Sequence, residues 1–182
     1  MQFVFAPIWG RLSDRIGRRP IIIGSLVVTA GSYLLFAMAT SLPVLFFSRI
    51  LAGVAGGVIP TTQAYIADTT TPAERTKGMG MIGAAFGLGF IFGPAIGGVL
   101  SRHGYSVPAY VACGLSLLAA VLAVFVLPES LPKAKRAAAI AMRRAAPTLL
   151  HALGRPTVGL VLMLFFLGTL AFSMLEGTFA LI

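Results

Sequence analysis

Charged side chains are scarce in this sequence, and one acidic residue lies among several arginines. Only 5 of the 182 residues are acidic, and Asp14 shares the segment 10–20 with four arginines. Gly10 at its start and Gly17 within it allow the backbone to turn sharply. Carboxylates near helix N-termini and cations near C-termini interact favourably with the helix dipole. We therefore expect Asp14 to fix a turn between two helices. A loop that only set topology would be basic, but would not need this spacing.

Two more charged residues lie within long apolar segments, Arg49 within 43–66 and Glu176 within 157–182. As a helical residue, Arg49 lies about 9 Å inside the outer end of its segment. An intramembrane charge costs at least ~2.5 kcal/mol and usually marks a transport pathway or an ion pair. The alternative is that Arg49 extends its guanidinium to the nearby interface. Counted from the opposite, basic end, both residues lie at a depth of about 27–28 Å.

Glycine is concentrated in the segment 78–100. Three glycines recur at every fourth position: Gly89, Gly93 and Gly97. This spacing forms a stripe that lets another helix backbone approach closely. Pro94 removes a backbone donor in mid-segment and is expected to bend the helix. Ordinary small-residue packing would explain the stripe, but not the adjacent Gly-Pro and Gly-Gly pairs.

The elements that position these residues are apolar runs of helix-spanning length. Hydrophobic residues make up 58% of the chain and charged residues only 10%, against about 25% charged in soluble domains. No charged residue occurs in 20–48, 50–67, 78–101, 103–128 or 156–175. About 20 apolar residues cross a bilayer as a helix. We therefore expect an all-α membrane protein with spans at 20–40, 43–66, 78–100, 108–127 and 157–182.

The net charge of +9 follows the same topology. Of the 14 basic residues, all but Arg49 and Arg102 lie in the segments 10–20, 67–77 and 129–156. Basic loops face the cytoplasm, so these three segments are predicted to be cytoplasmic. The positive charge thus predicts topology and gives no reason to expect a nucleic-acid partner.

No pattern in the sequence predicts an enzyme, a metal site or a cofactor. The single cysteine, Cys113, lies in an apolar span, so no disulfide or cysteine-based metal framework can form. The histidines, His103 and His151, are predicted on opposite sides of the membrane. We find no glycine-rich phosphate loop followed by Lys, and no nucleophile elbow.

The ends of the chain predict a fragment. Residues 2–9 are mostly apolar but reach only about 12 Å as a helix, so they are expected to be the last turns of a helix. The chain then comprises half a helix and five spans. Residues 1–128 are expected to belong to one bundle and 157–182 to a second. Between them, 129–156 is a proline-containing basic linker, with a short surface helix around 134–146.

Three motifs resemble those of the major facilitator superfamily. The first segment resembles motif A through Gly10, Leu12, Asp14, Arg15, Gly17, Arg18 and Arg19. The segment 45–57 resembles motif B through Arg49, Gly53, Gly56 and Gly57. The glycine-rich helix resembles motif C of the antiporter branch through Gly80, Gly89, Gly93, Pro94, Gly97 and Gly98. Further similarity to tetracycline/proton antiporters and related drug exporters lies in 67–70, 72–75 and 128–130.

The resemblance implies roles for the charged residues. It implies a fold of twelve helices, of which this chain covers the end of helix two to helix seven, and a conformational-switch role for the motif A loop. It also implies that Arg49 lies near the central cavity and takes part in proton coupling. Asp68 and Glu176 join it as candidates for coupling or gating. We hypothesise that Arg49 and Glu176 approach near the outer gate, or else that Glu176 faces an outer vestibule unpaired.

The predicted function is alternating-access, proton-coupled export of a small organic compound or drug across the cytoplasmic membrane. Its expected partners are the substrate, protons, the lipid bilayer and the remaining helices of the full-length chain. Polar cavity candidates are Thr61, Thr62 and Gln63. The sequence does not assign tetracycline as the substrate. Two alternatives remain, a symporter or facilitator for a sugar or metabolite, and a truncated chain that transports nothing.

Overall fold

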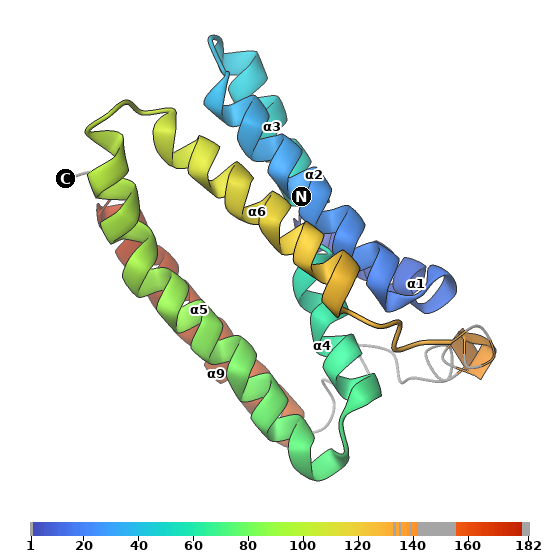
Figure 1. Cartoon of the computed structure of the whole chain (residues 1–182). Helices are drawn as coiled ribbons and strands as arrows, with labels where there is room; N and C mark the ends of the chain where they lie inside the picture. The colour runs from blue at the N-terminus through green and yellow to red at the C-terminus, as the bar shows by residue number, and fades with distance from the viewer. Residues whose placement is uncertain (1, 133, 135, 139, 142–155, 180–182) are drawn as a thin grey trace. The chain divides into compact units, whose positions relative to one another are not determined.

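The computed structural model describes residues 2–132, 134, 136–138, 140–141 and 156–179, and its long elements there are all α-helices. They are α1 (Gln2–Ile16), α2 (Arg18–Ala37), α3 (Leu42–Val54), α4 (Val58–Thr69), α5 (Pro72–Ser101), α6 (Val107–Val126) and α9 (Pro156–Phe179) (Figure 1). The all-α prediction is confirmed for these residues. The chain divides into two compact units, 1–140 and 141–182, and each is described by itself.

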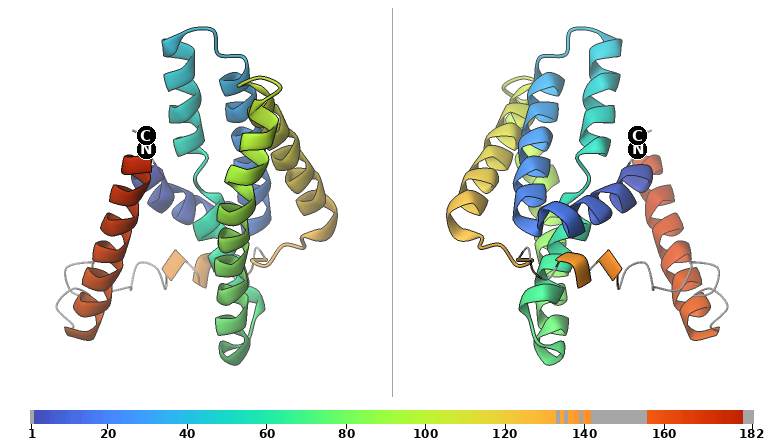
Figure 2. Two further views of the ribbon diagram at one scale, coloured as in Figure 1. Left: turned by 90° about the vertical axis from the view of Figure 1, so that its left-hand side faces the viewer. Right: turned by 90° about the vertical axis from the view of Figure 1, so that its right-hand side faces the viewer.

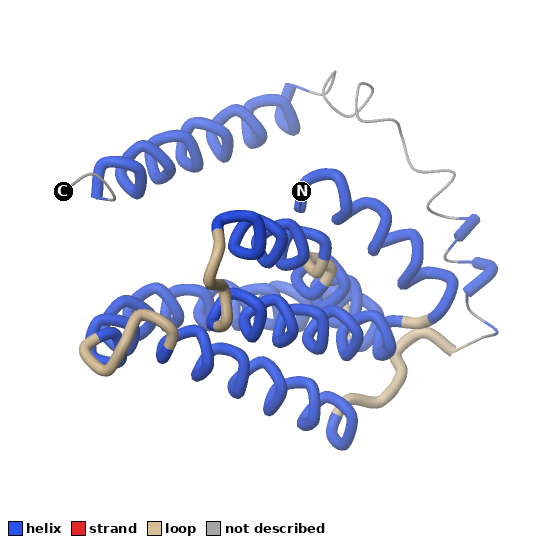
Figure 3. Tube along the Cα trace, turned by 90° about the horizontal axis from the view of Figure 1, so that it is seen from above, coloured by secondary structure: helices blue, strands red, loops and turns tan. Residues whose placement is uncertain are grey.

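Four segments of the described chain are long and apolar enough to cross a membrane. They are Arg18–Ala37, Leu42–Thr69, Pro72–Ser101 and Val107–Val126. These coincide with the first four predicted spans, and the connections between the helices are short (Figure 3). In the second unit, α9 begins within one residue of the fifth predicted span, and Gly159–Ala171 forms its described apolar stretch.

Helix α2 is central to the first unit. It packs along α6 and also contacts α3, α4 and α1 (Figure 1). Beside Ile21 and Ile22, the buried apolar residues of α2 and α6 are small: Ala30, Ala37, Ala109, Cys113 and Ala120. Small residues allow the close backbone approach that drives helix association in a bilayer, where apolar side chains gain nothing by leaving lipid. Many large apolar side chains are accordingly exposed.

The turn expected over 10–20 is much shorter in the structure, and that prediction is wrong. Helix α1 continues through Gly10 to Ile16, and α2 begins at Arg18, so Gly17 alone separates the two helices. The segment stays helical because its side chains divide by face. Ser13 and Asp14 are buried, while Arg11 and Arg15 are exposed.

The single helix expected over 43–66 is divided in two, so this prediction also needs correction. Helix α3 ends at Val54 and α4 begins at Val58, with a turn at residues 55–57 between them (Figure 2). Gly56 and Gly57 lower the local helix propensity there. The expected cytoplasmic segment 67–77 is likewise mostly helical, because α4 runs to Thr69 and α5 starts at Pro72.

The linker predicted at 129–156 falls largely outside the described residues. Within the helix expected around 134–146, residues 134, 136–138 and 140–141 are helical. The start of the linker, residues 129–131, lies in the first unit and contributes directly to the site described next.

Candidate functional site

The turn between α1 and α2 is formed by Gly17 in a left-handed conformation. Its φ is 117°, which L-residues with a side chain rarely adopt. The Gly17 N–H donates to the Ser13 carbonyl at 3.1 Å, which closes the end of α1. The Ser13 hydroxyl in turn donates to the Gly10 carbonyl at 2.9 Å. The next residue, Arg18, therefore starts α2 directly beside the last turn of α1.

Arg18 is a buried arginine bonded to residues of two other segments. Its side chain is 8% exposed, and Nη1 lies 2.7 Å from Asp14 Oδ1 on α1. Its Nε lies 3.0 Å from Asp68 Oδ2 at the end of α4, and Nη1 also donates to Ser13 Oγ at 2.6 Å. Charge-assisted bonds of this kind are about twice as strong as neutral ones. Because Asp14 is only 6% exposed, removing the arginine would leave a buried carboxylate without this cation.

A third carboxylate reaches the same turn from a distant part of the chain. Glu129 Oε1 accepts the backbone N–H of Arg18 at 2.8 Å and that of Leu131 at 3.0 Å. It therefore caps the N-terminus of α2, where backbone donors lack helical partners. A Cβ on Gly17 would press against the carboxyl end of the Glu129 side chain, which can shift, so glycine is required there for its φ.

Two further arginines join neighbouring segments to this turn. Arg136 Nη1 donates to the Arg15 carbonyl at 3.3 Å, and its Nε donates to the Leu131 carbonyl at 3.2 Å. The Arg19 guanidinium donates to the Val124 carbonyl at the end of α6. The guanidinium groups thus hold the ends of α1, α2 and α6 together with the start of the linker. Hereafter Ser13, Asp14, Arg18, Asp68 and Glu129 are called the Arg18 cluster.

The structure therefore brings together part of the predicted switch loop and one residue assigned elsewhere. Asp14, Gly17 and Arg18 meet at the turn, and Asp68 joins them. Glu129 was not among the predicted site residues. A sequence signal for Glu129 does exist. It is an acidic residue that directly follows an apolar span, at the start of a basic segment. Arg15 is exposed and contributes through its carbonyl.

Arg49 contacts aromatic rings in the neighbouring helix. Its Cζ lies 4.1 Å from the centre of the Phe36 ring and 5.8 Å from that of Tyr33. Both rings belong to α2, and such contacts attract a cation to the ring face. The side chain of Glu176 lies outside the described side chains, so the Arg49–Glu176 pair stays a prediction.

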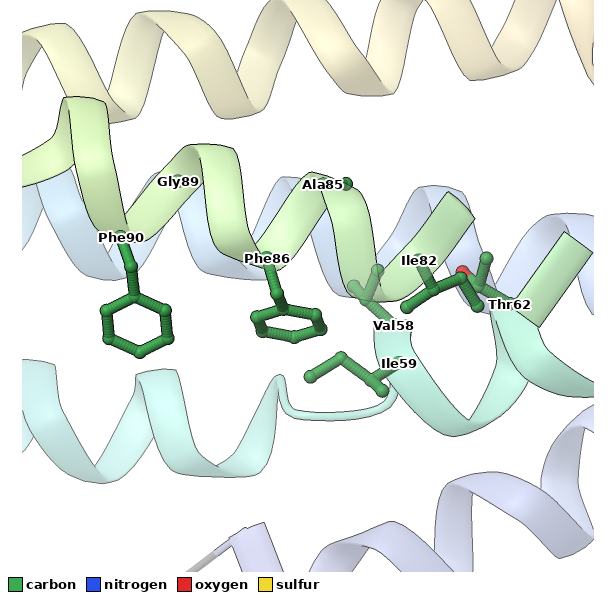
Figure 4. A pocket seen from close by; sticks show the side chains of 8 residues that line it. All are labelled: Val58, Ile59, Thr62, Ile82, Ala85, Phe86, Gly89 and Phe90. Atoms are coloured by element: carbon green, nitrogen blue, oxygen red, sulfur yellow. The ribbon is translucent and has the colours of Figure 1, made fainter. Parts of the chain in front are cut away.

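An open apolar cavity of about 570 Å³, broadly exposed on one side, lies between α4 and α5 (Figure 4). It is lined by Val58, Ile59, Thr62, Ile82, Ala85, Phe86, Gly89 and Phe90. Of the three predicted polar candidates, only Thr62 lines this cavity. Thr61 is fully buried elsewhere in the helix, and Gln63 is exposed.

Comparison with known proteins identifies the family. The family model described as Major Facilitator Superfamily matches residues 1–182. The chain belongs to the major facilitator superfamily. This confirms the predicted resemblance to the superfamily. It also confirms the prediction of a multi-pass membrane protein.

Several members of the superfamily resemble this chain closely. It is 43% identical over 131 residues to multidrug resistance protein 2 of Bacillus subtilis, covering 71% of this chain and 33% of that protein. It is 39% identical over 125 residues to the class B tetracycline resistance protein of Escherichia coli, covering 69% and 31%. The crystal structure of the human organic anion transporter MFSD10 (TETRAN) matches with a TM-score of 0.67 and 36% identity, covering 74% and 31%. The chain thus spans about a third of the length of these relatives.

The glycine-rich helix α5 of this major facilitator chain has no buried residue. In the Arg18 cluster, by contrast, several side chains are buried. It is continuous through Pro94, and Thr71 and Glu74 form a capping box at its start. A Cβ added at Gly80, Gly89, Gly93, Gly97 or Gly98 would meet no atom within 4 Å. Within the first unit, the described residues therefore do not make the close contact predicted for the stripe.

Proposed function

We propose that this chain is part of a secondary transporter that exports a small organic compound in exchange for protons. The observation that carries the proposal is the Arg18 cluster, in which a buried arginine joins α1, α2 and α4 and a carboxylate from the linker caps the same turn. Membership of the superfamily and similarity to the two resistance proteins support an export role.

In this proposal the Arg18 cluster stabilises one state of an alternating-access cycle. Its Arg18–Asp14 pair is buried, so separating the two charges would be costly and the cluster would resist small displacements. Glu129 brings the start of the linker into the cluster, so movement between the two bundles would act on the turn through that carboxylate. Gly10, Arg15 and Arg19 support the turn through their backbone or by joining α6 to it.

Asp68 acts in gating rather than in proton binding on this account, because it is bonded to Arg18 Nε. Proton coupling is assigned to Arg49 and Glu176, which lie within the apolar spans. The aromatic rings of Phe36 and Tyr33 compensate the charge of Arg49. Protonation of a carboxylate near Arg49 would then change the attraction between the two bundles.

The cavity between α4 and α5 forms one wall of the substrate path. Its lining is almost wholly apolar, with Thr62 as a polar contributor, which suits a small apolar or amphipathic compound. The glycine stripe of α5 would serve as a close-packing surface for a helix of the second bundle. Thr61 and Gln63 stay candidate cavity residues in this proposal, and the protein acts as a carrier without chemical catalysis.

Vesicle transport tests this function. The gene's full open reading frame is expressed in a bacterial host without its main efflux pumps, and inverted cytoplasmic-membrane vesicles are prepared. A panel of fluorescent drugs, tetracycline and organic anions is offered with and without an imposed proton gradient. We expect at least one compound to accumulate only with the gradient. Equal accumulation after the gradient is dissipated would instead identify a facilitator, and no accumulation of any compound would contradict transport of this class.

A further inference from the structure

The span Leu42–Thr69 is interrupted near its middle by three residues that are not helical. The α3 helix ends at Val54, and the Ala55 N–H still bonds to the Leu51 carbonyl at 2.9 Å. The Gly57 N–H bonds instead to the Ala55 carbonyl at 2.7 Å, and α4 starts at the next residue. Backbone groups released from a helix inside a bilayer need other partners, so such a break persists only where neighbours supply them.

Helix α1 supplies that partner. The Trp9 indole N–H donates to the carbonyl of Val54, and Val54 is the last residue of α3. The Trp9 ring also covers Gly57, where an added Cβ would lie 2.7 Å from Trp9 Cγ and 3.0 Å from Ser25 Oγ. The break is therefore filled from two other helices, and glycine is needed at position 57 for their approach.

The same helix α1 holds the other end of α4. Asp14, five residues after Trp9, binds Arg18, and Arg18 binds Asp68 near the end of α4. The end of the 12-residue helix α4 is thus connected to α1 through the Arg18 cluster. At its start, Trp9 packs against Gly57, the residue before α4, and joins α1 to the last residue of α3. The intervening residues Val58, Ile59 and Thr62 form the α4 wall of the cavity (Figure 4).

Two hydroxyl groups beside the break point to a second arrangement. Ser25 and Thr61 are both fully buried. Neither Ser25 Oγ nor Thr61 Oγ1 has a hydrogen-bond partner among the described residues. An unsatisfied buried polar group costs about 1–3 kcal/mol. A rotation of α4 that gives either hydroxyl a partner would recover part of that cost.

We propose that residues 55–57 are a hinge, that Trp9 holds it in the present state, and that α4 turns about it when the Arg18 cluster opens. The cavity wall then moves with α4 while α3 stays in place on α2. The inference rests on the proposed function only for calling the cavity a substrate path. The hinge itself is a property of the helices.

Cysteine accessibility tests the hinge without any transport. In a Cys113→Ala background of the full reading frame, one reporter is Thr62→Cys on α4 and a matched reporter is Phe47→Cys on α3. Maleimide labelling rates are measured in membrane vesicles without substrate or gradient, with and without Asp68→Asn. We expect Asp68→Asn to change the rate at Thr62→Cys about fivefold, a typical coupling between sites, and to leave Phe47→Cys within about twofold.

Removing the Trp9 contact should abolish that difference. Trp9→Phe keeps an aromatic ring but loses the N–H, so α4 should already be released and Asp68→Asn should add less than about twofold at Thr62→Cys. Gly57→Ala, whose Cβ would collide with Trp9, should act like Trp9→Phe. Gly24→Ala is the matched control, because its Cβ would meet no atom within 4 Å.

The outcomes separate this inference from the proposed function. Equal responses of the two reporters, no response to Asp68→Asn, or independent effects of Trp9→Phe and Asp68→Asn would each overturn the hinge. Coupled labelling in a protein that moves no compound would support the hinge and contradict the proposed function. Proton-driven export together with uncoupled labelling would support the proposed function and contradict the hinge. Membrane content of each variant, measured by immunoblot, identifies any variant that fails to fold, and Gly57→Ala then replaces Trp9→Phe.

Discussion

The Arg18 cluster and helix α5 use glycine in opposite ways. At Gly17 the absent side chain leaves room for the Glu129 carboxylate of the same unit, which bonds to the Arg18 N–H. Along α5 a Cβ added at the stripe glycines, Gly89, Gly93 and Gly97, would meet no atom within 4 Å, and no residue of the helix is buried. The Arg18 cluster therefore finds its partners within the first unit, whereas the stripe on α5 has no close-packed partner among the described residues of that unit. This difference agrees with a chain that spans about a third of its relatives.

Removing the central arginine of the Arg18 cluster should have the largest effect on stability. Arg18→Ala leaves Asp14 and Asp68 without their shared cation, and breaking a buried ion pair costs about 3–5 kcal/mol. We expect a loss of that size in the unfolding free energy, measured by denaturant titration in detergent. The control is Arg11→Ala, an exposed arginine of the neighbouring helix α1, which should change stability by less than about 0.5 kcal/mol. Equal losses in the two variants would show that the buried pairs contribute nothing.

Replacing a glycine by alanine should affect stability differently in the Arg18 cluster and in α5. Gly17→Ala places a residue with a side chain at φ 117° and against Glu129, so we expect a loss of about 1–3 kcal/mol. Gly93→Ala on α5, in this 182-residue chain in detergent, should be neutral or gain up to about 1 kcal/mol from helix propensity. In the full reading frame, Gly93→Ala should instead reduce transport, because a closely packed helix would be displaced. A wild-type transport rate in that variant would refute the packing role of the stripe.

Truncating the linker carboxylate should have a smaller effect. Glu129→Ala removes the side-chain acceptor for the Arg18 and Leu131 N–H groups, and losing a helix cap costs about 1 kcal/mol. Glu74→Ala, which removes the capping box of α5, is a matched change at another helix start. Stability measured for both in detergent should show similar losses. Only Glu129→Ala should also slow transport, since only Glu129 belongs to the cluster.

The aromatic contact of Arg49 should give the smallest change. Phe36→Leu keeps an apolar side chain but removes the ring face 4.1 Å from the guanidinium, and an exposed cation–π contact is worth about 0.5–1 kcal/mol. Thermal unfolding in detergent should therefore move by only a few degrees. Phe47→Leu is the control on α3. A larger shift for Phe47→Leu than for Phe36→Leu would contradict a role of this ring in holding Arg49.

Much of the topology could be predicted from the sequence because charge-free runs and basic loops are local properties. The end of α1 could not, since Arg11 and Arg15 made a basic segment look like a loop although they only line its exposed face. Gly56 and Gly57 fit both close packing and a helix break, and Trp9 decides between them through a contact 45 residues away. Glu129 reaches Arg18 across 111 residues, a distance that no local pattern can reveal.

The central claim is that the Arg18 cluster controls transport by holding α4 and the linker start to the switch turn. Its most direct test is the initial rate of proton-driven export in vesicles containing Asp14→Asn, with membrane content matched to wild type. Asp14→Asn keeps the shape of the side chain but removes its charge from a pair that is 6% and 8% exposed. The account predicts a rate reduced at least about tenfold, as expected when a coupling of ~1.4 kcal/mol or more is lost. A wild-type rate with unchanged gradient dependence would contradict it.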